Sequence, residues 1–162
     1  MAEEVGLSMA DPVVDALNGL IATEMRAVNQ YFVHAKCAQN WGYPKLAAKF
    51  REISIEEMND IEVYMDRVLL LGGLPNLQRL EAFQVGENVP EQLDAAIALE
   101  EGAIVQLKDA VALCESSDDI GTAELLRPKV ADEEAQLDWL RTQRGLVDQL
   151  GEALYLTTLT EI

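Results

Sequence analysis

The strongest constraint on this chain is a set of four glutamates placed at repeated intervals in apolar, helix-forming sequence. They are Glu24, Glu57, Glu100 and Glu133. The interval from the first to the second is 33 residues, and the interval from the third to the fourth is the same. In helical bundles that hold two iron ions, two helices supply one Glu each and the other two supply Glu-x-x-His. The spacing therefore predicts a metal-binding helical bundle.

The histidines of such a site are missing. The third residues after Glu57 and Glu133 are Asp60 and Gln136, and the single histidine of the chain, His34, lies elsewhere. A ligand set of carboxylates and one amide suits hard cations such as Mg²⁺, Ca²⁺, Mn²⁺ or Fe²⁺ better than zinc or copper. Aspartate reaches less far than histidine, and an amide is a weak ligand. We therefore expect metal binding to survive and oxygen-driven turnover to be impaired.

Each predicted helix carries an apolar stripe that includes its glutamate. The stripes are Leu17, Leu20, Glu24, Val28 and Tyr31; Leu46, Phe50, Ile53, Glu57, Asp60, Tyr64 and Leu71; Leu93, Ile97, Glu100, Ile104, Leu107 and Val111; and Leu126, Val130, Glu133, Gln136 or Leu137, Leu140 and Val147. Burying an ionised carboxylate without a partner costs several kcal/mol, so cations among these groups are expected. The alternative is that the stripes are rotated and the glutamates are surface residues. Matching intervals on four separate stripes favour the buried arrangement.

Length and composition predict one all-α domain over residues 1–162. The chain is 49% hydrophobic, has five prolines and is rich in Leu, Ala and Glu. Four long helices are predicted from about 12 to 40, 45 to 71, 90 to 115 and 120 to 150, followed by a short apolar tail over 152–159. The long segment between the second and third helices can cross the bundle end to end, which would make those helices parallel. Pro128 should kink or restart the fourth helix near Leu125.

Charge and cysteine content limit the partners and the compartment. The formal net charge of −17 argues against nucleic acid and anionic membranes and favours cations, although acidity can also serve solubility alone. Cys37 and Cys114 lack metal-type spacing and are expected to be free thiols in a reducing compartment. Residues 1–10 lack the features of a signal peptide, and no apolar stretch is long enough to span a bilayer. We expect a cytoplasmic protein.

Over nearly its full length the chain resembles a bacterioferritin subunit. The resemblance is strongest at residues 24–35 (EMRAVNQYFVHA), 40–42 (NWG), 73–78 (GLPNLQ), 132–134 (DEE) and 138–140 (DWL). It implies a ferritin-like four-helix bundle with a long crossover between helices two and three and a short fifth C-terminal helix. It also implies a hollow shell of twenty-four subunits that stores oxidised iron, with the fifth helix lining four-fold channels.

The resemblance further implies haem b, which this family binds between two subunits through one Met from each. The matching residue is Met58. Because it follows Glu57 directly, its side chain points about 100° away from the inward stripe, towards a neighbouring subunit. Ile55 and Met65 share its face, and Met25, Asn29 and Phe32 form a similar face on the first helix. The alternative for Met58 is ordinary packing between subunits.

The family's metal pattern matches at all four glutamates and departs at Asp60 and Gln136, where the family has histidine. Ferroxidase activity, the oxidation of Fe²⁺ by oxygen or peroxide, is therefore the property most affected. The shell could be homomeric, or mixed with a second, histidine-bearing subunit for which this chain supplies haem. Two other classes stay open, namely a ferritin-like di-metal carboxylate enzyme without storage and a metal-free helical scaffold.

Overall fold

A computed structural model of the chain describes residues 11–160, and every regular element in this range is a helix. Residues 1–10, on which the prediction about a signal peptide falls, lie outside this range, as do residues 161–162. The helices are α1 (Pro12–Asn40), α2 (Pro44–Leu70), α3 (Val89–Ser116), α4 (Ile120–Leu150) and α5 (Glu152–Thr157). The prediction of four long helices and a short fifth one is confirmed.

The helix boundaries follow from capping residues in the sequence. The side chain of Asp11 accepts a hydrogen bond from the backbone N–H of Val13 at 2.9 Å, and Pro12 opens α1. At the end of α2, Gly72 adopts a φ of 79°, and the N–H of Gly73 donates to the carbonyl oxygen of Val68 at 2.9 Å. These signals placed the predicted ends of α1 and α2 within about a residue of the observed ones.

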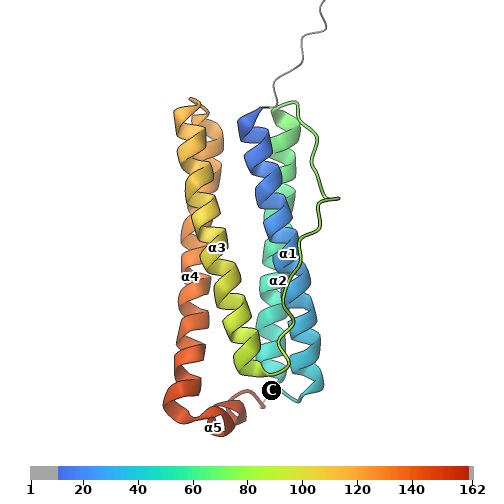
Figure 1. Ribbon diagram of the computed structural model, residues 1–162, viewed down its shortest axis with the longest axis vertical. Helices are drawn as coiled ribbons and strands as arrows, with labels where there is room; N and C mark the ends of the chain where they lie inside the picture. Colours follow the sequence, from blue (N-terminus) through green and yellow to red (C-terminus); the bar gives the residue numbers. More distant parts are fainter. Residues whose placement is uncertain (1–10, 161–162) are drawn as a thin grey trace, which may run out of the picture.

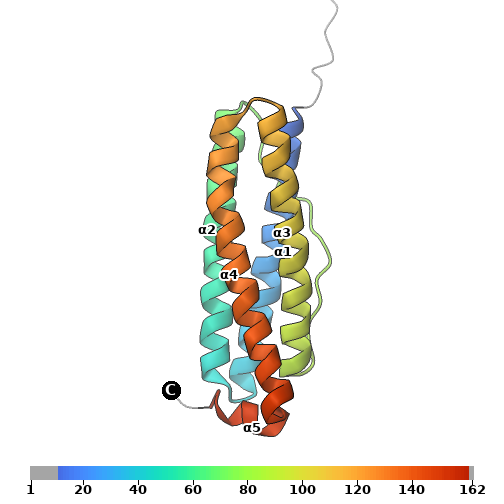
Figure 2. The same cartoon turned by 90° about the vertical axis from the view of Figure 1, so that its left-hand side faces the viewer.

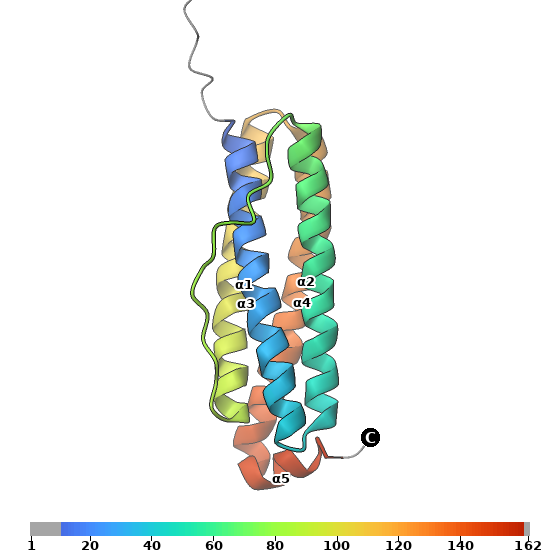
Figure 3. The ribbon, with the colours of Figure 1, turned by 90° about the vertical axis from the view of Figure 1, so that its right-hand side faces the viewer.

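The four long helices form a bundle of two antiparallel pairs, α1 with α2 and α3 with α4 (Figures 1 and 2). The crossover, residues 71–88, runs along the outside of the bundle from the end of α2 to the start of α3, as Figure 3 shows most clearly. Helices α2 and α3 are therefore parallel, as predicted. Helix α5 lies across the end of the bundle at which α1 ends, and the carbonyl oxygen of Leu159 accepts from the Lys45 N–H at 3.3 Å.

The crossover is attached to α1 by side chains that bond to its backbone. Asn18 donates to the carbonyl of Leu74 at 3.1 Å. Further along, the N–H of Gly86 donates to Nε2 of buried His34 at 3.3 Å. These bonds satisfy backbone groups of a long segment that has no regular structure. The only histidine of the chain thus serves the crossover, away from the glutamates.

Burial lowers the pKa of His34 from 6.5 to about 4, although the backbone of Gln84 opposes the shift. The unfolded chain therefore takes up this proton first as the pH falls. The neutral, buried His34 therefore contributes its full share to the free energy of unfolding above about pH 6.5. This share falls by about 3 kcal/mol as the pH decreases to 4. We expect His34→Gln, compared with the natural chain, to remove this loss from the pH profile of the thermal unfolding midpoint. Parallel profiles for the two proteins between pH 4 and 6.5 would contradict the assignment.

Helix α4 runs without interruption through Pro128, so the predicted restart near Leu125 is wrong. Proline lacks the N–H that would bond to the carbonyl of Glu124, and both residues are exposed, so water can satisfy that carbonyl. The proline is therefore expected to lower the stability of the fold without interrupting the helix. We expect Pro128→Ala to raise the free energy of unfolding by about 1–3 kcal/mol, measured by denaturant titration. A neutral or destabilising effect would contradict this explanation.

The apolar core consists of two clusters, one towards each end of the bundle. The cluster near α5 includes Tyr31, Phe50, Leu93, Leu140 and Tyr155, all fully buried. The other includes Leu17, Leu20, Tyr64, Leu107 and Leu126. On α2, α3 and α4 the glutamate identified from the sequence falls between the segments that build these two clusters, and on α1 Glu24 lies where the two segments meet. The fold therefore places four carboxylates at mid-height, with apolar packing on either side.

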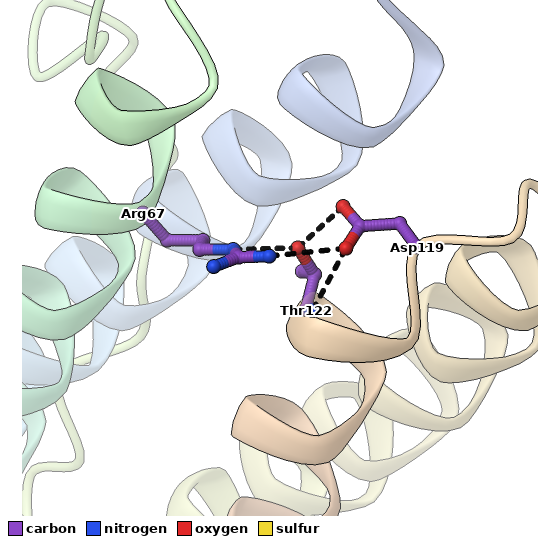
Figure 4. Close-up of polar contacts among 3 residues, drawn as sticks. All are labelled: Arg67, Asp119 and Thr122. Carbon is purple, nitrogen blue, oxygen red and sulfur yellow. Dashed lines mark hydrogen bonds and ion pairs between the residues drawn. The ribbon is translucent and has the colours of Figure 1, made fainter.

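A polar network joins the end of α2 to the start of α4 (Figure 4). Arg67 donates to the hydroxyl of Thr122 at 2.7 Å and to the carboxylate of Asp119 at 3.0 Å, and the N–H of Thr122 donates to Asp119 at 2.9 Å. Burial acts to raise the pKa of Asp119, but these hydrogen bonds lower it overall. A Cβ at Gly121 would lie 2.7 Å from the Arg67 guanidinium, so a larger residue there would make the end of the Arg67 side chain shift.

Candidate metal centre

The structure brings the four glutamates together inside the bundle, one from each long helix. They are 1% (Glu24), 3% (Glu57), 1% (Glu100) and 4% (Glu133) exposed, so the surface alternative is wrong. Oxygens of Glu24, Glu57 and Glu133 lie within 4.8 Å of one another. Ligand oxygens lie about 2.0–2.6 Å from a bound Mg²⁺ or Ca²⁺ ion, so two oxygens about 4–5 Å apart can bind the same cation.

Two neutral donors point into this cluster. The hydroxyl of Tyr31 donates to Oε1 of Glu100. The side-chain amide of Gln136 donates to Oε1 of Glu100 at 2.9 Å and to Oε1 of Glu57 at 2.8 Å. A side-chain amide carries two N–H bonds, so Gln136 uses both on carboxylates of the centre. It acts here as a donor to the glutamates.

Asp60 stands at the edge of the cluster and forms an ion pair with Lys129 of α4. Both side chains are only partly exposed, 14% for Asp60 and 21% for Lys129. The ammonium group brings a positive charge beside the carboxylates without any metal. The residue that replaces the first histidine is therefore engaged by a cation that the chain itself provides.

The carboxyl groups perturb one another strongly. Burial, followed by repulsion from Glu57, raises the pKa of Glu24 well above its ordinary value. Burial and the charge of Glu100 raise the pKa of Glu57 to about 7, and burial together with the neighbouring glutamates raises the pKa of Glu133 far more. Burial and mutual repulsion therefore favour the protonated forms of these three carboxyl groups when no cation is present. A cation that binds must displace those protons.

A cavity of about 550 Å³ leads from the surface between α2 and α4 to this cluster. Its lining includes Glu57, Asp60, Lys129, Glu133, Gln136 and Trp139. The half-buried ion pair of Asp60 and Lys129 lies in its wall. An ion from solvent could therefore reach the carboxylates through this opening, past one fixed positive charge.

Sequence reasoning did not identify Tyr31 and Lys129 as residues of the site. Tyr31 was counted as apolar, although a buried tyrosine needs a partner for its hydroxyl. Lys129 lies four residues before Glu133, on the same helical face, and that spacing was the available signal. Both residues supply hydrogen bonds or charge that the glutamates would otherwise lack.

Met58 lies apart from the cluster, on the outer surface of α2. Its side chain is 52% exposed, and Ile55 and Phe32 are also large apolar residues with about half of their surface exposed. The hydroxyl of Ser54 donates to the carbonyl of Val28 at 2.9 Å, which fixes the level at which α2 passes α1. Large apolar side chains are therefore exposed on both of these adjacent helices.

Two further expectations from the sequence concern the cysteines and membrane-spanning helices. Cys37 and Cys114 are free thiols, as predicted. No helix within residues 11–160 combines the length and apolarity that crossing a bilayer requires.

The sequence is similar to known ferritin-like proteins, which agrees with the helical bundle described above. A model of the ferritin-like domain matches residues 14–150. The chain is 44% identical over 146 residues to bacterioferritin BfrA of Mycobacterium tuberculosis, covering 90% of this chain and 92% of the relative. It is 43% identical over 152 residues to a bacterioferritin of Streptomyces coelicolor (93% and 91%), and 37% identical over 143 residues to one of Brucella melitensis (88% and 89%).

Proposed function

The chain belongs to the bacterioferritin family of ferritin-like proteins, and from this premise we propose that it is an iron-storage subunit of a hollow shell of twenty-four chains. The shell binds haem b at its two-fold interfaces and contains a metal centre that lacks both histidines. One observation carries the proposal: four buried glutamates, one from each long helix, meet inside a bundle of this family. Iron is the substrate and the stored cargo. The cytoplasmic location stays a prediction.

Exposed apolar side chains support assembly into a larger particle. Such residues gather along the end of α2 and the crossover: Leu69, Leu70, Leu74, Leu77, Leu80 and Phe83. Soluble proteins seldom leave many large apolar side chains exposed in one region unless another surface covers them. We assign these residues to contacts between subunits, and α5 to the four-fold channels.

The surface around Met58 fits a haem shared by two subunits. A thioether is a known axial ligand of haem iron, and Met58 presents one in the open, on a helix that also exposes Ile55, while the neighbouring helix α1 exposes Phe32. A flat apolar ring needs such surroundings on both faces, and a second copy of the same surface supplies the other face. When bound, haem supplies one-electron chemistry for the release of stored iron.

In the metal centre the chain's own residues determine what Fe²⁺ meets. Glu24, Glu57 and Glu133 offer carboxylate oxygens to a cation, and any proton bound to them must leave when the cation enters. Gln136 offers N–H groups where the family has an imidazole. Asp60 is held by Lys129. We therefore propose that this chain oxidises Fe²⁺ slowly on its own.

A second candidate is a catalytically silent subunit of a mixed shell. It is favoured by the same engagement of Asp60 and Gln136 by protein groups. In this version a histidine-bearing partner subunit oxidises the iron, and this chain binds haem and forms part of the shell wall. A di-metal carboxylate enzyme without storage is the less favoured alternative, because the long crossover and α5 belong to shell-forming architecture.

Sedimentation velocity of the purified chain, followed at 280 nm and at the haem band, tests the proposal. Twenty-four chains of 17.9 kDa give about 430 kDa. We expect one particle of this size with haem absorbance sedimenting with it. A species of one or two chains would refute the shell, and a full-size particle that takes up no added haem would refute the haem assignment.

A further inference from the structure

We infer that the centre of this subunit takes one divalent cation in place of two, held by Glu24, Glu57 and Glu133, because the chain's own donors close the other half. The inference rests on the proposed function in one respect, since it treats the same glutamates as the metal centre. It concerns how many cations bind and which residue limits that number.

In the open half of the centre, the Gln136 amide reaches only Glu57. Carboxylate oxygens of the three glutamates lie within 4.8 Å of one another, and all three side chains are buried. Among residues 11–160, Oε1 of Glu24 has no hydrogen-bond partner and no access to solvent. A buried carboxylate oxygen without a partner is costly, and a cation between these oxygens would satisfy it.

The closed half is centred on Glu100. Its Oε1 accepts hydrogen bonds from the hydroxyl of Tyr31 and the amide of Gln136, while its Oε2 is buried without a partner among the described residues, so the amide and not a lack of free oxygens closes this half. The second N–H of that amide reaches Oε1 of Glu57, so the amide nitrogen lies between two carboxylates. A second cation would have to bind in this position. It would meet N–H hydrogens there, which carry positive partial charge, and could bind only after two hydrogen bonds were broken.

The ion pair at the edge makes a second cation less necessary. Lys129 brings one positive charge to Asp60, and this pair lines the same cavity as Glu57, Glu133 and Gln136. Five carboxylates need fewer mobile cations when one of them already faces an ammonium group. Lys129 thus supplies part of the charge that a second divalent ion would bring.

The two replaced histidine positions are expected to behave differently. Gln136→His removes the donor between Glu57 and Glu100 and supplies a ligand, so it should raise the number of tightly bound cations from one to two. Asp60→His leaves Gln136 in place, so the number should stay at one. The two substitutions therefore form a matched pair. They distinguish a second cation position that the Gln136 amide blocks from a position that only needs an imidazole ligand.

Manganese is a suitable probe because it does not need oxygen to report its binding. The metal-free, assembled chain would be dialysed to equilibrium against Mn²⁺, and bound metal would be counted by mass spectrometry and examined by electron paramagnetic resonance. We expect one tightly bound Mn²⁺ per subunit with the six-line signal of an isolated ion. Glu24→Gln should abolish it, and Glu62→Gln, at an exposed position of the same bundle, should not.

Two Mn²⁺ per natural subunit with the spectrum of a coupled pair would overturn the inference. Tightly bound Mn²⁺ that persists in the Glu24→Gln protein would overturn it as well. A value of one for a folded Gln136→His protein, checked by circular dichroism, would overturn the role given to the amide. These outcomes are independent of particle size. A failed shell therefore refutes the proposed function while leaving the cation count readable.

Discussion

Replacing Asp60 and Gln136 together by histidine is expected to accelerate Fe²⁺ oxidation by roughly 10- to 100-fold, the range in which residues around a metal site typically alter its activity. The physical reason is that the change removes a donor amide from Glu57 and Glu100 and frees the first histidine position from Lys129. Imidazoles then complete both Glu-x-x-His sequences. Stopped-flow absorbance after mixing with Fe²⁺ in air measures the initial rate.

The matched control for this variant is Asp66→His, which adds an imidazole at an exposed position of α2. Its oxidation rate should equal that of the natural chain. If the double variant binds two cations per subunit and yet oxidises Fe²⁺ no faster, then the missing histidines do not limit the rate. The explanation would then have to lie in access through the cavity between α2 and α4.

Met58→Leu is expected to abolish haem binding. Leucine has a similar volume and stays apolar, so the surface should remain suited to packing while the thioether sulfur is lost. The absorbance of added haem in the purified particle measures the effect. Met65→Leu, two helical turns further along α2, is the control and should keep its haem. Retention of full haem absorbance by Met58→Leu would contradict the assignment.

Much of the fold could be predicted because its signals are local. Asp11 with Pro12 and the glycines after α2 mark helix ends through backbone geometry that the sequence alone determines. The stripes also placed Glu24, Glu57, Glu100 and Glu133 in the interior, because an apolar stripe has only one stable side to face. All four are buried in the structure.

The parts that could not be predicted depend on contacts between helices. Whether Gln136 offers its oxygen or its N–H groups is decided by Glu57 and Glu100, which lie far away in sequence. The partner of Asp60 is likewise decided by how α2 faces α4, and Lys129 could not be recognised from α4 alone. The restart predicted at Pro128 was wrong because an exposed carbonyl can bond to water and the helix can continue.

The most direct test of the central claim is the time course of iron oxidation by the purified homomeric particle. Fe²⁺ would be added in air at increasing ratios per subunit and followed by stopped-flow absorbance. We expect a slow rise without a fast phase, since Gln136 and the pair of Lys129 with Asp60 leave no complete two-iron centre. A fast phase that saturates at two Fe²⁺ per subunit would contradict this claim.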